Sequence, residues 1–90
     1  GAKGTTRDTF ELIRQSEKYG ARVALFGRKI NNAESPVKLV ELMRTVVEGF
    51  HKPAEVVKIY HKYLSDKGIE SKLSLENDLQ VTEKVLLNDL

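Results

Sequence analysis

The fold expected for this chain is decided by residues 20–30, which read GARVALFGRKI. Residues 21–26 are mostly apolar and stand between Gly20 and Gly27, a pattern typical of a buried parallel strand. A helix is predicted before this strand, over residues 9–19, and more helices follow it. A helix, a glycine, a short apolar strand and another helix form the alternation of a parallel-sheet protein. We therefore expect an α/β fold in which helices predominate.

Two long helices are predicted in the middle of the chain. Residues 35–36, Ser-Pro, are a typical N-cap and first-turn pair, and Gly49 marks the end of the helix that they begin. Pro53 begins the next helix, which ends at Gly68. The apolar stripe predicted to face the core from the first of these helices is Val40, Met43, Val47 and Phe50, widened by Leu39, Leu42 and Val46. The stripe of the second is Val56, Ile59, Tyr60, Tyr63 and Leu64.

The expected inventory is about four helices and one strand, which leaves the strand without a partner. A lone strand cannot satisfy its own backbone hydrogen bonds. A second copy of the chain, a segment outside this sequence, or a second short strand at residues 2–6 would supply one, and these alternatives stay open. We expect one domain over residues 1–90, with barrel-like βα units over 1–68 and a helical tail over 69–90 that Ser74 caps.

Composition excludes several classes of site and partner. The chain has no cysteine, so disulfides, thiol catalysis and cysteine zinc sites are excluded, and a reducing cytoplasm is the expected location. No apolar run approaches the roughly 20 residues of a membrane span. The net charge of +2 is too small to indicate a nucleic-acid partner. The basic excess lies in residues 1–38, where a small anion could be held, whereas the acidic excess of residues 69–90 suggests a solvated face.

A candidate anion site follows the predicted strand. Gly27 has no Cβ, so an anion can approach its N–H closely, and Arg28 adds a forked, permanently charged donor. Lys29 is interpreted as a second phosphate-side cation and not as a catalytic amine. In α/β folds, ligands bind at the carboxyl ends of strands. A glycine turn with a solvated arginine is also an ordinary strand ending, so this motif alone is weak.

Residues 20–30, followed by Ser35-Pro36-Val37, resemble the eighth strand and its helix in class I aldolases of the fructose-bisphosphate aldolase, DeoC and LacD group. The likeness is strongest to the archaeal-type, DhnA-like branch, and it covers roughly residues 3–60. The residues that carry it in the strand are Gly20-Ala21, the apolar run 23–26, Gly27-Arg28 and Ile30. Residues 3–6 with Asp8, Phe10 and Glu11 resemble the loop after strand seven and its helix, and residues 46–49 and 53–55 resemble the closing helices.

This resemblance implies a fragment of a (β/α)8 barrel that binds the phosphate of a sugar-type ligand. The implied phosphate-binding residues are Gly4, Gly27, Arg28 and Lys29. Lys29 stands where the family usually has Asn, and residues 31–32, Asn-Asn, replace its usual aromatic residue or Gln. The family's Schiff-base lysine lies on strand six, which would precede Gly1. The resemblance thus implies an aldolase-like lyase as parent, while this chain alone has no catalytic residue, cofactor or metal and is expected to be inactive.

Other conspicuous side chains have plainer interpretations. His51 and His61 are ten residues apart with no carboxylate at ligand spacing, so solvated or interfacial histidines are favoured over a metal site. Asp8 and Glu11 suit a capping box for the first helix better than a general acid and base. Lysines and tyrosines interleave over residues 58–63, which indicates a solvated helix face more than a nucleic-acid surface.

Two functional hypotheses remain. The first is the phosphate-binding, C-terminal portion of an aldolase-like barrel protein. The second is a non-enzymatic helical oligomerisation or interaction module, because amphipathic helices, a small core and an unpaired strand favour a homo-oligomer. Neither a membrane nor a nucleic acid is an expected partner.

Overall fold

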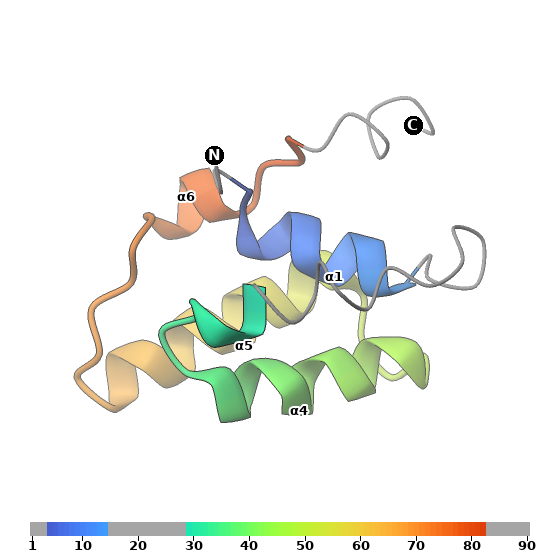
Figure 1. Ribbon diagram of the computed structural model, residues 1–90, viewed down its shortest axis with the longest axis horizontal. Coiled ribbons are helices and arrows are strands. Elements are labelled where there is room, and N and C mark those ends of the chain that lie inside the picture. The colour runs from blue at the N-terminus through green and yellow to red at the C-terminus, as the bar shows by residue number, and fades with distance from the viewer. Residues whose placement is uncertain (1–3, 15–28, 83–90) are drawn as a thin grey trace.

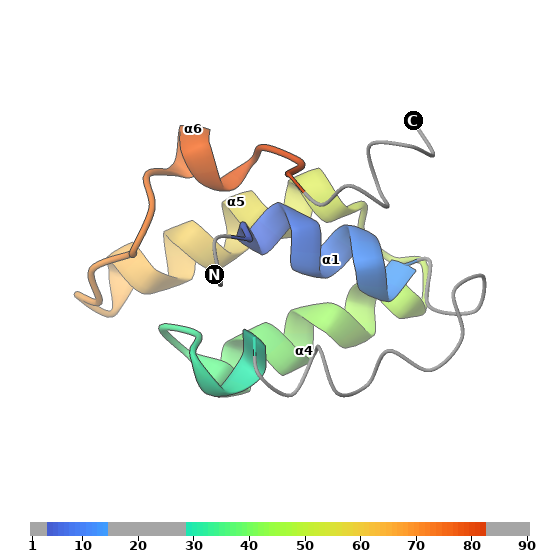
Figure 2. The same ribbon diagram turned by 45° about the horizontal axis from the view of Figure 1, so that its top comes forward.

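The computed structural model of the chain describes residues 4–14 and 29–82. The helices in these residues are α1 (Thr6–Arg14), α4 (Pro36–Val47), α5 (Pro53–Asp66) and the short α6 (Leu75–Asp78), with a further helical turn at residues 29–31. α4 and α5 lie side by side, and α1 packs against both of them (Figures 1 and 2). The short helix α6 contacts α5 and lies next to the N-terminal end of α1.

The α/β fold class predicted above is wrong, because residues 4–14 and 29–82 contain helices and no strand. The three longer helices bury their apolar sides against one another, so their core needs no sheet. The core residues are Phe10, Leu12, Leu39, Leu42, Met43, Val46, Val56, Val57, Tyr60 and Leu64. The predicted strand at 21–26 lies outside the described residues, and within the proposed second strand at 2–6, Thr6 is already helical. Since a sheet needs strands that pair, the described residues offer no barrel-like unit.

α1 begins earlier than the sequence indicated. Thr5 and Asp8 form its capping box: the Thr5 hydroxyl oxygen accepts from the Asp8 backbone N–H at 3.1 Å, and Asp8 Oδ2 accepts from the Thr5 N–H at 2.9 Å. The predicted box of Asp8 with Glu11 is therefore wrong. Glu11 instead pairs with Arg7 Nε at 2.8 Å and with Arg14 Nη2 at 3.0 Å.

α4 and α5 confirm the predicted helix starts at Pro36 and Pro53. Each is followed by a glycine in the left-handed region, Gly49 with φ 82° and Gly68 with φ 72°. Side chains with a Cβ rarely adopt this conformation, which explains why glycine closes both helices. The short connection at residues 48–52 thereby turns the chain so that α5 packs against α4.

The buried side of α4 differs from the predicted stripe. Its buried residues are Leu39, Leu42, Met43 and Val46. Val40, Val47 and Phe50, which the helical spacing predicts to face the core, are 48%, 60% and 72% exposed. α4 carries apolar residues around most of its circumference, so the spacing alone fits more than one face. Packing against α1 and α5 decides between them.

The last predicted helix is only four residues long where the structure describes it. Ser74 caps α6 as expected, its hydroxyl oxygen accepting from the Asn77 backbone N–H at 3.2 Å. Residues 83–90, the remainder of the predicted helical tail, lie outside the described residues. In residues 4–14 and 29–82, no helix combines the length and the apolar character that crossing a bilayer requires.

Candidate functional site

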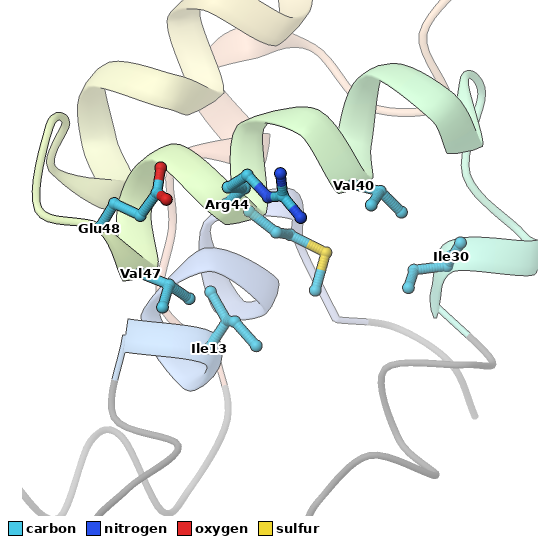
Figure 3. A pocket seen from close by; sticks show the side chains of 7 residues that line it. Ile13, Ile30, Val40, Arg44, Val47 and Glu48 are labelled. Atoms are coloured by element: carbon cyan, nitrogen blue, oxygen red, sulfur yellow. The ribbon is translucent and has the colours of Figure 1, made fainter.

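An open groove of about 390 Å³ runs along one side of α4. Ile13 at the end of α1 and Ile30 in the helical turn form its opposite wall (Figure 3). The α4 residues that line it are Val40, Met43, Arg44, Val47 and Glu48. Its floor is apolar, and its charged groups lie only on the α4 side.

The groove borders a solvent-facing surface that we call the outer face of α4, made of Val37, Val40, Glu41, Arg44, Val47 and Glu48. Successive residues of an α-helix are turned by about 100°, which fixes the order of these side chains around α4. Val40 and Val47 form the edge beside the groove, the valine edge. Glu41 and the C-cap residue Glu48, whose side chain also reaches the groove, form the other edge, the glutamate edge, with Val37 and Arg44 between the two edges. Val37 is 81% exposed, so an apolar side chain lies in the middle of a solvent-exposed surface.

The charges on this face are only partly paired. Glu41 accepts from Lys38 Nζ at 2.8 Å, yet the Glu41 side chain stays 61% exposed. Arg44 and Glu48 are four residues apart, but they form no ion pair with each other or with another described residue. A basic residue that precedes an acidic one at this spacing is the less favourable order for pairing within a helix. One cation and one carboxylate therefore remain available on the outer face of α4.

A second cluster, which we call the polar latch, ties the C-terminal segment to the start of α1. It consists of Thr5, Thr6, Asp8, Asp78 and Thr82. The Thr6 backbone N–H donates to Asp78 Oδ1 at 2.6 Å, and the Thr82 backbone N–H donates to Asp8 Oδ1 at 2.7 Å. The Thr5 hydroxyl donates to the Gln80 carbonyl oxygen at 2.5 Å. Both carboxylates are buried, and each accepts hydrogen bonds at the positive end of α1, which compensates for the loss of water.

His61 extends the latch to α5. Its Nε2 lies 2.6 Å from Asp78 Oδ2, and its side chain is only 10% exposed. His61 is therefore not solvated but lies where α5 meets α6, and Asp78 is buried, unlike the solvated face predicted for the acidic tail. Because Asp78 also accepts a hydrogen bond from the N-terminal end of α1, we interpret the His61–Asp78 pair as structural. In the described residues, no three His, Cys, Asp or Glu side chains are grouped as metal ligands would be.

Tyr60 is a buried hydroxyl in the core between α5 and the loop before α4. Its Oη accepts from the Ser35 backbone N–H at 2.9 Å and donates to Glu34 Oε1 at 3.1 Å. Burial raises the pKa of the Tyr60 hydroxyl well above its usual value, and the negative charge of Glu34 adds to that effect. This tyrosine therefore holds the start of α4 and is not poised for proton transfer at neutral pH.

The predicted phosphate-binding residues are only partly placed. Gly27 and Arg28 lie outside the described residues. Gly4 lies just before the cap of α1, and Lys29 opens the helical turn at 29–31; both are half-buried.

The polar latch was missed by the sequence interpretation, because its partners are 72 to 75 residues apart in the chain. No local spacing signals such a contact. The outer face of α4 was missed for a different reason: the helical spacing predicts that Val40 and Val47 face the core.

Comparison of the chain with protein-family models finds no match, and comparisons with curated proteins and with solved structures find none either.

Proposed function

We propose that this chain is a non-enzymatic helical module that self-associates through the outer face of α4. The observation that carries the proposal is the exposure of Val37, Val40 and Val47 on one side of a helix whose other side is in the core. Full burial of one valine side chain stabilises an assembly by roughly 1.5 kcal/mol. Three exposed valines, of which Val40 and Val47 line the groove, therefore provide a driving force for association.

A second copy of the chain is the occupant that fits this face best. The face carries both signs of charge, Arg44 in the middle and Glu41 and Glu48 along one edge. A surface of mixed sign can complement itself, as closed two-fold dimers require. A partner of one charge sign would leave like charges opposed.

The interface is expected to be small. A helix of twelve residues is about 18 Å long, and one helix face buries less than the roughly 800 Å² per partner of a standard interface. We therefore expect a weak dimer that exchanges rapidly with monomer.

Sedimentation equilibrium tests the proposal on three proteins. The unmodified chain should shift from monomer to dimer between about 10 μM and about 1 mM. Val40→Glu should weaken the association at least about tenfold, because it places a charge against an apolar surface. Lys58→Glu on the exposed side of α5 is the matched control, and should dimerise like the unmodified chain. Circular dichroism shows whether each variant keeps its helices. A chain that is monomeric throughout, or a folded Val40→Glu protein that dimerises normally, contradicts the proposal.

A second candidate function rests on the Gly27-Arg28-Lys29 run and its resemblance to the aldolase phosphate loop. We propose that these residues bind a small phosphorylated ligand. A titration with inorganic phosphate, followed by NMR, tests this proposal. The amides of Gly27, Arg28 and Lys29 should shift at millimolar phosphate, and unmoved amides at those positions would end it.

A further inference from the structure

We infer that two copies pair their α4 helices antiparallel, with Val40 of each copy against Val47 of the other. The inference rests on the proposed self-association and specifies its geometry. It follows from how the valine edge and the glutamate edge are distributed on the outer face of α4.

Two-fold symmetry determines which edges meet. When two helices pair antiparallel about a two-fold axis, each edge of one face meets the same edge of the other face. When they pair parallel, each edge meets the opposite one. Antiparallel pairing therefore packs valine edge on valine edge. Parallel pairing would press the valines against Glu41 and Glu48, whose carboxylates would lose water without gaining a donor.

The positions of the two valines set the register. Facing Val40 with Val47 of the second copy brings the centre of the dimer close to Arg44 of each chain. The same register sets Val37 level with the connection that follows α4 of the second copy, where Phe50 is 72% exposed.

Arg44 provides the charge complementarity on the other edge. Antiparallel pairing also brings the two glutamate edges together, which alone would be repulsive. Arg44 lies in the middle of each face, within two residues of being level with Glu41 of the second copy. It therefore lies between its own Glu48 and that carboxylate, and gains the ionic partner that it lacks among residues 4–14 and 29–82.

The groove lies on the side of α4 where the valine edges of the two copies meet. It borders the valine edge, and Ile13 and Ile30 form its far wall (Figure 3). In the antiparallel pair, Val47 of the second copy approaches Val40 at the rim of this groove. The grooves of both copies then open on the same side of the dimer.

Disulfide mapping tests the geometry without interference, because the chain contains no cysteine. Val40→Cys protein and isotope-labelled Val47→Cys protein are mixed, oxidised under mild conditions and resolved by mass. Antiparallel pairing predicts that the mixed Val40→Cys/Val47→Cys disulfide forms several-fold faster than either homodimer. Preferential formation of the two homodimers overturns the antiparallel inference while leaving self-association intact. Failure of all cross-links, together with a monomer in sedimentation, overturns both.

A charge exchange tests the role of Arg44 independently. Arg44→Glu should lower the association constant of the dimer at least about tenfold. The change adds a fifth and a sixth carboxylate to the two outer faces, beside the four of Glu41 and Glu48. Adding Glu41→Arg to the same chain restores opposite charges across the interface, and should recover most of the loss. Circular dichroism confirms that both variants fold. If the single variant dimerises as the unmodified chain does, or if the double variant is no stronger than the single one, Arg44 does not bridge the copies and the register is wrong.

Discussion

His61 and Asp78 join the middle of α5 to the end of α6, with Nε2 and Oδ2 2.6 Å apart. The other oxygen of the same carboxylate accepts from the Thr6 backbone N–H at 2.6 Å. One buried side chain thus connects α5, α6 and the first turn of α1. It also satisfies a backbone donor that α1 cannot satisfy itself, since the first N–H groups of a helix have no partner within it.

Replacing Asp78 should therefore lower the free energy of unfolding more than replacing an exposed residue of the same segment does. Asp78→Ala removes both hydrogen bonds and leaves the partly buried Thr6 N–H without an acceptor, at a cost of about 2 kcal/mol. Asp78→Asn keeps an oxygen for Thr6 and should cost about half as much. Urea unfolding followed by circular dichroism measures both values. Equal losses for the two variants would show that the acceptor at Thr6 contributes nothing.

The cap of α1 gives a second prediction. Thr5→Ala removes the hydroxyl that accepts from the Asp8 N–H and should destabilise the chain by about 1 kcal/mol. Thr5→Ser keeps the hydroxyl and serves as the matched control, expected within a few tenths of a kcal/mol of the unmodified chain. If Thr5→Ser loses as much as Thr5→Ala, the methyl group matters and the cap does not.

Tyr60 gives a prediction in alkaline solution. The pKa of its hydroxyl is raised in the folded chain by burial and by Glu34, so above the usual value of about 10 the unfolded chain releases this proton more readily than the folded chain does. The stabilisation that the protonated Tyr60 hydroxyl gives to the folded chain is therefore present below pH 10 and is lost as the pH rises beyond it. Tyr60→Phe should cost about 1 kcal/mol at pH 8, because the Ser35 N–H loses its acceptor.

Urea midpoints of the unmodified chain and of Tyr60→Phe, measured from pH 8 to pH 11, test this account. Lysine titration affects both proteins alike, so a difference between their curves reports on Tyr60. The unmodified chain should lose stability more steeply than Tyr60→Phe above pH 10. Parallel curves for the two proteins would show that Tyr60 does not titrate differently in the folded state.

Local signals in the sequence were sufficient to predict the starts of two helices. The prolines at 36 and 53 and the glycines at 49 and 68 mark helix ends through backbone geometry that acts within a few residues. Such signals do not depend on the rest of the fold, so the sequence alone is enough to predict these helix ends.

Choices that depend on tertiary contacts could not be predicted in the same way. Thr5–Asp8 and Asp8–Glu11 have the same spacing, and the structure shows that Thr5 and Asp8 form the cap, while Asp8 also accepts from the Thr82 N–H across 74 residues. Val40 and Val47 share helical spacing with Met43, so periodicity could not show that Met43 is buried and the valines are exposed. The α/β class failed for the same reason: one apolar run indicated a strand, but packing among α1, α4 and α5 forms the core.

The candidate site was even less accessible from the sequence. Gly4, Gly27, Arg28 and Lys29 were selected through a resemblance and a glycine turn. The outer face of α4 became visible only when the core had been located, because a surface patch is defined by what the core leaves out.

The most direct test of the central claim is an NMR dilution series of the unmodified chain, recorded from about 1 mM down to about 20 μM. Self-association predicts that amide shifts change with concentration along α4 from Val37 to Phe50 and beside the groove at Ile13 and Ile30. The amides around His61 and Asp78 should stay fixed. Spectra that do not change with concentration, or changes centred on the polar latch, would contradict the claim that the outer face of α4 is where two copies meet.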